Sequence, residues 1–82
     1  MSETSKKSEA EIQKAVGFLK EGRDHVKKWL TQQGVMDEKT GVFVRECYFI
    51  FRQGSRSNIT IEQFANVTDI EIDAAVRWIT KD

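Results

Sequence analysis

Three helix-start signals, in a chain of 82 residues that contains no proline, constrain the fold more than any other feature of the sequence. Each is a capping box, in which a Ser or Thr and a Glu or Gln three residues later satisfy backbone N–H groups at the start of a helix. The three pairs are Ser8 with Glu11, Thr60 with Gln63, and Thr68 with Glu71. Because these local signals agree with one another, we predict an all-α fold of about four helices in a single domain.

The first capping box opens a long amphipathic helix, which we expect over residues 9–33 and ended by Gly34, after a flexible tail at residues 1–7. Its apolar side chains recur at steps of three and four residues: Ile12, Ala15, Val16, Leu19, Val26 and Leu30, with Phe18 and Trp29 beside them. Gly22 falls within this stripe although glycine weakens a helix. We therefore expect another helix to pack closely at that point.

The most apolar segment of the chain, residues 42–53, fits a helix better than a strand. A strand would place the adjacent charges of Arg45 and Glu46 on opposite faces of a sheet. Helical spacing instead gathers one apolar face: Val44, Cys47, Tyr48 and Phe51. We expect Gly54 at the C-terminus of this helix, where glycine is common.

Loops are expected on both sides of this helix. Residues 35–41 precede it, with Asp37 and Thr40 as candidate helix caps, and residues 55–58 follow it.

Residues 60–79, TIEQFANVTDIEIDAAVRWI, have the layout of a helix-turn-helix. A short helix reaching Asn66 carries Ala65 where two helices must approach closely, and a second helix is expected over residues 69–80. Ile70 is expected to fill the gap behind the turn. The second helix would pack through Ala75 and Ile79, with Trp78 beside them.

This pattern resembles the helix-turn-helix modules of small bacterial and phage regulatory proteins, and it is similar to the C-terminal part of a flagellar-operon regulatory protein family. The resemblance covers about residues 42–81. It implies a three-helix unit that begins with the helix at 42–53, and it implies DNA binding. The turn position that such modules usually give to glycine, because φ is positive there, is Asp69 in this chain.

The charge of this module disfavours DNA reading. The chain is neutral overall, but residues 59–82 carry two Lys or Arg against five Asp or Glu. Arg77 and Lys81 on the outer face of the last helix could contact bases, whereas Asp73 would repel phosphates and is expected to pair with Arg77 one turn away. Two further basic residues flank the module: Arg52 and Arg56.

Two functions are therefore open. The first is a DNA-binding transcriptional regulator, as a monomer or a dimer. The second, which the weak basic charge favours slightly, is a regulatory protein that binds a protein partner, or itself, in transcription or a related process. Phe18, Trp29 and Met36 are candidate interface residues in this case, because such side chains are enriched in interface cores; alternatively, they complete the protein core.

Catalysis and cofactor binding find no support in the sequence. His25 is the single histidine and Cys47 the single cysteine, so neither zinc-ligand spacing nor a disulfide is available. The chain also lacks a phosphate-binding glycine loop and an apolar run long enough to span a membrane. Because the first residues lack an apolar stretch, we expect no signal peptide. We expect a cytoplasmic, non-enzymatic protein with no metal, cofactor, small-molecule substrate or membrane association.

Overall fold

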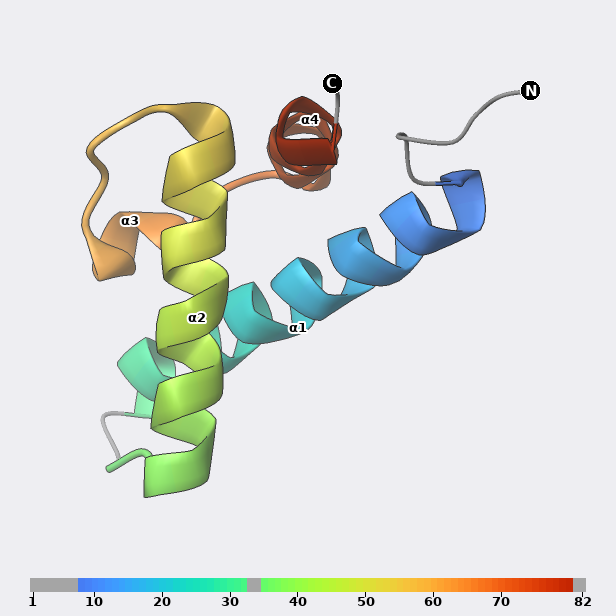
Figure 1. The fold of residues 1–82 in the computed structure, drawn as a ribbon. Coiled ribbons are helices and arrows are strands. Elements are labelled where there is room, and N and C mark those ends of the chain that lie inside the picture. The colour runs from blue at the N-terminus through green and yellow to red at the C-terminus, as the bar shows by residue number, and fades with distance from the viewer. Residues whose placement is uncertain (1–7, 33–34, 81–82) are drawn as a thin grey trace.

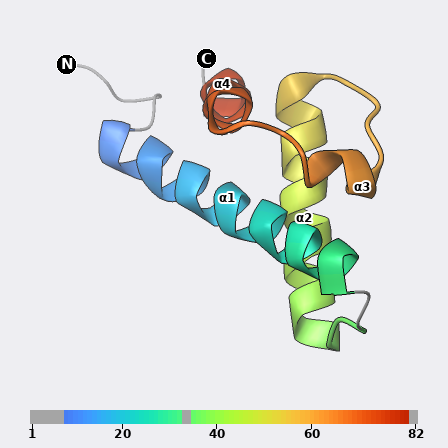
Figure 2. The same ribbon diagram turned by 180° about the vertical axis from the view of Figure 1, so that it is seen from behind.

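The computed structural model describes residues 8–32 and 35–80, and these residues form four α-helices and no strand (Figures 1 and 2). The helices are α1 (Glu9–Gln32), α2 (Glu38–Ser55), α3 (Ile61–Phe64) and α4 (Asp69–Thr80). The predicted all-α fold with a long first helix is confirmed. The expected tail at residues 1–7, the helix end at Gly34 and the candidate residue Lys81 lie outside the described residues.

The two long helices, α1 and α2, cross each other, and α4 lies in the angle between the N-terminal half of α1 and the C-terminal end of α2 (Figure 1). The short α3 packs against α1 and leads into α4 through residues 65–68 (Figure 2). The last helix therefore contacts both long helices.

The predicted capping boxes are present. The Ser8 hydroxyl accepts from the Glu11 N–H at 3.2 Å while the Glu11 carboxylate accepts from the Ser8 N–H at 3.1 Å. The same reciprocal hydrogen bonds join Thr60 with Gln63 and Thr68 with Glu71. The starts of α1, α3 and α4 thus follow from local sequence.

The predicted bounds of α2, residues 42–53, were wrong at both ends. The helix begins at Glu38 because Asp37 caps it, accepting from the Thr40 backbone N–H at 3.3 Å and from the Thr40 hydroxyl at 2.6 Å. It ends at Ser55, and Arg56 takes the left-handed capping conformation, with φ of 58°. The expected loop at residues 35–41 is correspondingly shorter, whereas the loop after α2 runs from Arg56 to Thr60.

The predicted end of α3 at Asn66 was also wrong. The helix stops at Phe64, and the backbone N–H groups of Ala65 and Asn66 bond three residues back, to the carbonyls of Glu62 and Gln63. This tighter spacing is typical of a terminating helix.

One core joins all four helices and the turn after α3. Its buried side chains are Val16, Leu19, Val26, Val44, Cys47, Phe51, Phe64, Ala65, Ile72, Ala75 and Val76. The predicted apolar face of α2 is confirmed, with Val44, Cys47 and Phe51 buried and Tyr48 partly buried, its hydroxyl donating to the Ile59 carbonyl at 2.6 Å.

Two glycines set how closely the helices cross. A Cβ at Gly22 of α1 would lie 2.5 Å from the Cys47 sulfur of α2, which confirms the predicted close packing there. A Cβ at Gly54 of α2 would overlap the carbonyl oxygen of Ala75 in α4. Gly54, expected to end α2, instead lies inside the helix and lets α4 approach the α2 backbone.

We predict that Gly54→Ala destabilises the protein by about 1–3 kcal/mol, because the added methyl group can be accommodated only by moving α4 away from α2. Gly17→Ala is the matched control, since a Cβ at Gly17 meets nothing within 4 Å. This second change should stabilise α1 by about 0.5–1 kcal/mol. Urea denaturation of both variants tests the pair, and equal effects would contradict the close α2–α4 contact.

Candidate interaction surfaces

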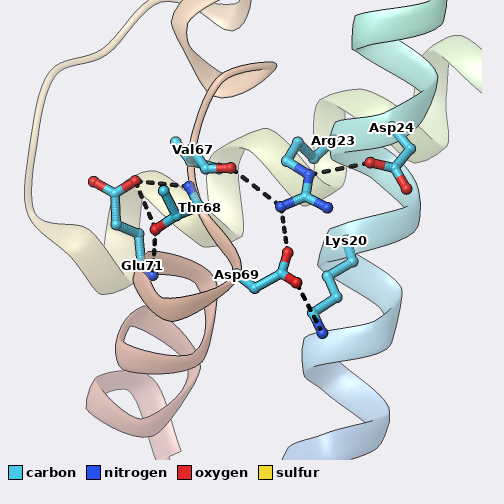
Figure 3. Close-up of polar contacts among 7 residues, drawn as sticks. All are labelled: Lys20, Arg23, Asp24, Val67, Thr68, Asp69 and Glu71. Atoms are coloured by element: carbon cyan, nitrogen blue, oxygen red, sulfur yellow. Dashed lines mark hydrogen bonds and ion pairs between the residues drawn. The ribbon is translucent and has the colours of Figure 1, made fainter.

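An arginine of α1 holds the turn that precedes α4 (Figure 3). Arg23 Nη1 donates to the Val67 carbonyl at 3.1 Å and to Asp69 Oδ1 at 2.6 Å, while its Nε donates to Asp24 at 3.1 Å. Lys20 Nζ lies 3.6 Å from the other Asp69 oxygen. We call the contacts of Lys20 and Arg23 with Val67 and Asp69 the Arg23 clamp.

Asp69 has a different role from the one its position in the helix-turn-helix pattern suggested. It is the first residue of α4, and the single non-glycine residue with positive φ in the described chain is Arg56. The turn therefore needs no glycine at this position. The side chain that replaces glycine binds α1, which the sequence pattern did not indicate.

The Arg23 guanidinium, with a contribution from Lys20, holds the pKa of Asp69 below its usual value of 3.8. A carboxyl group with a lowered pKa in the folded state stabilises the fold above its unfolded pKa and loses this contribution as the pH falls through the folded pKa. The Arg23 clamp should therefore weaken in acid.

We predict that the free energy of unfolding falls between about pH 5 and pH 2, and that Asp69→Asn removes part of this acid sensitivity because the uncharged amide does not titrate. The measurement is urea denaturation across that pH range. Glu46→Gln is the control, because Glu46 is exposed and makes no ion pair with any described residue. A wild-type pH dependence in Asp69→Asn would show that the Arg23 clamp contributes nothing to it.

The candidate DNA-contacting base of α4 is held by two carboxylates. Arg77 donates through Nη1 and Nη2 to the two oxygens of Glu9 in α1, at 3.2 and 2.7 Å, and through Nε to Asp73. The predicted Asp73–Arg77 pair is therefore present, and the sequence pattern did not indicate Glu9. These hydrogen bonds raise the pKa of Arg77. The guanidinium neutralises neighbouring acids instead of projecting alone into solvent.

The expected role of Ile70 behind the turn was wrong. Ile70 is 80% exposed, and the partly buried Val67 packs against the core instead. Ala74 and Trp78 are also exposed, the latter by 44%, so the outward side of α4 carries an apolar row beside the exposed charges of Glu71 and Arg77. Of the residues expected to pack α4, Ala75 is buried, whereas Ile79 remains 37% exposed.

The two flanking bases have different surroundings. Arg52 donates to Asn58 at 2.7 Å and lies over the Tyr48 ring, so it holds the end of α2 to the following loop. Arg56 is exposed and its guanidinium lies 5.1 Å from the centre of the Trp78 ring. Neither base joins Arg77 in one basic surface, because Arg77 extends toward α1.

Two of the three candidate interface residues lie together in an apolar groove. We call it the α1–α2 groove, and its apolar lining comprises Trp29, Val35, Met36, Val42, Val44 and Ile61. Trp29 and Met36 are partly buried, whereas Val35 is fully exposed and Val42 is 49% exposed. The third candidate, Phe18, lies elsewhere, 38% exposed and packed edge to face on Phe43 with ring centres 4.7 Å apart.

Cys47 and His25, which the sequence does not support as catalytic residues, pack against other side chains of the fold. Cys47 is buried, and burial raises the pKa of its thiol to about 12. His25 packs edge to face against Phe43. Within residues 8–32 and 35–80, no cluster of three or more His, Cys, Asp or Glu side chains could hold a metal ion, and no helix has the length and apolar character to cross a membrane.

Comparison with known proteins gives no match to a family model, to a curated protein or to a solved structure. The resemblance to helix-turn-helix regulators therefore remains a prediction from the sequence.

Proposed function

We propose that this chain is a small, non-enzymatic regulatory protein that uses a helix-turn-helix-like scaffold to bind a protein partner in transcription or a related process. The observation that carries the proposal is the outward side of α4. Where a DNA-binding helix would present basic side chains, this helix presents Ile70, Ala74 and Trp78. Its one described basic residue, Arg77, is bound to Glu9 and Asp73.

Charge supports a protein partner over DNA. Affinity for DNA comes largely from Lys and Arg that neutralise phosphates. The described residues of α4 carry three acids, Asp69, Glu71 and Asp73, against Arg77 alone. A phosphate that approached this helix would meet more negative than positive charge.

The α1–α2 groove is the surface that we assign to the partner. Val35 and Val42 leave apolar area in contact with water, and Trp29 and Met36 form a partly buried floor on which an apolar side chain could pack. Glu38, which also lines the groove, could pair with a basic side chain of the partner. These features suit an amphipathic helix with an apolar anchor and a neighbouring Lys or Arg.

Direct DNA binding is the alternative, and one observation favours it. Arg56 is exposed beside α4 and makes no ion pair with a described carboxylate. Together with Lys81 it could supply positive charge to a nucleic-acid contact.

Fluorescence anisotropy with a labelled random duplex separates the two functions. At about 50 mM salt, where non-specific affinity is strong for a DNA-binding protein, we expect no binding. Saturable binding that weakens as salt is added, and that Arg56→Gln reduces, would establish the alternative.

Site-specific photo-crosslinking in cells tests the assigned surface. We expect a photoreactive amino acid at Val42 to give a discrete protein adduct, and Val35→Asp to reduce that adduct because it places a charge in the groove. Lys27 is the control position, since it is exposed on α1 and does not line the groove. The same adducts at Lys27, or adducts unaffected by Val35→Asp, would exclude the groove as the binding surface.

A further inference from the structure

The outward side of α4 has a regular apolar row beside the end of α2. Ile70, Ala74 and Trp78 are spaced four residues apart, so they follow one ridge of the helix. The large side chains stand at the two ends of the row and the small one at its centre. A shallow hollow between α4 and the C-terminal end of α2 borders this row, and its lining includes Glu71, Ala74, Trp78 and Arg56.

Two opposite charges lie on the same edge of this row. Glu71 comes three residues before Ala74. Arg56 lies over the ring of Trp78, which comes four residues after Ala74. Among the described residues, neither Glu71 nor Arg56 forms an ion pair, whereas the other charged side chains described on α4 all do. The acid and the base are therefore separated along α4 by nearly the length of the row.

A two-fold axis that passes beside Ala74 would place each group of this row opposite a group of a second copy that it can bind. The rotation reverses the helix direction, so Ile70 of one copy comes level with Trp78 of the other. The edge of the row that carries Glu71 and Arg56 then faces the same edge of the other copy. Glu71 therefore comes level with the other copy's Trp78 and with the Arg56 that lies over it. A small residue on the axis allows two helices to approach closely.

We propose that two copies of this chain form a symmetric dimer in which α4 packs antiparallel on the partner's α4, with Ala74 at the axis. Ile70 then packs on the partner's Trp78, and Glu71 pairs with the partner's Arg56. Such an interface is isologous, so each contact occurs twice. The dimer leaves the Arg77 contact with Glu9 in place and does not involve the α1–α2 groove, which we assign to the protein partner.

The dimer is small and reversible. A helix of twelve residues is about 18 Å long, and contacts confined to such a length fall in the range of weak, concentration-dependent interfaces. Sedimentation equilibrium over a wide concentration range should therefore show a monomer–dimer equilibrium.

Cysteine crosslinking tests the position of the axis. In Ala74→Cys, two thiols on a two-fold axis should form a disulfide-linked dimer under mild oxidation, faster by roughly tenfold or more than in the exposed control Lys27→Cys, because the dimer holds them together. The native Cys47 does not interfere, since it is buried. Equal crosslinking rates at the two positions would overturn the proposed axis.

Charge exchange tests the pairing. Glu71→Arg should weaken dimerisation by roughly tenfold, because it turns two attractive pairs into repulsive ones. Adding Arg56→Glu to that variant should restore the affinity, and both variants lack the Glu71 cap, so loss of the cap cannot explain the recovery. Absence of recovery in the double variant, or a wild-type protein that stays monomeric at every concentration, would overturn the proposal.

Discussion

The placement of α4 depends first on the guanidinium of Arg23. Arginine presents several N–H donors in a rigid plane, and here one side chain of α1 bonds the Val67 carbonyl and the Asp69 carboxylate on either side of the point where α4 begins. The Arg23 side chain is only 15% exposed, so these hydrogen bonds are partly shielded from water. These polar contacts act together with the core packing of Ala65 and Val67 to hold the turn against the longest helix.

The close contact at Gly54 fixes the rotation of α4 about its own axis. Because α4 rests on the α2 backbone there, with Ile72, Ala75 and Val76 in the core, rotation of α4 about its axis is restricted by packing. The opposite side of the helix must then face outward, and it carries Ile70 and Ala74. A scaffold that is shaped like a helix-turn-helix need not read DNA, since function depends on the residues that the scaffold presents.

The sequence allowed prediction of those features that depend on near neighbours. Capping boxes located three helix starts, and helical periodicity located the buried face of α2 and most of that of α1, where Leu30 and Phe18 are exposed instead. Asp37 was identified as a candidate cap, but the predicted start of α2 followed the apolar run instead, which displaced it by one turn. Around the start of α4, composition could not decide whether Val67 or Ile70 would be buried, because both are apolar and the choice depends on α1.

The contacts that orient α4 could not be predicted, because their partners are far apart in the chain. Arg23 and Asp69 are separated by 46 residues, and Glu9 and Arg77 by 68. Each of these residues reads locally as an exposed charge on a helix. The candidate site depends on the same kind of contact: helical spacing predicts the Asp73 partner of Arg77, whereas the Glu9 partner comes from a distant helix and could not be predicted.

The orientation of α4 can be measured most directly by NMR of dilute protein with labelled isoleucine methyl groups and a soluble paramagnetic agent. Ile70 is 80% exposed whereas Ile72, two residues later, is fully buried. The structure predicts strong relaxation of the Ile70 methyl signals and almost none for those of Ile72. Equal relaxation of the two residues, or stronger relaxation of Ile72, would contradict the placement of α4 on which the proposed functions depend.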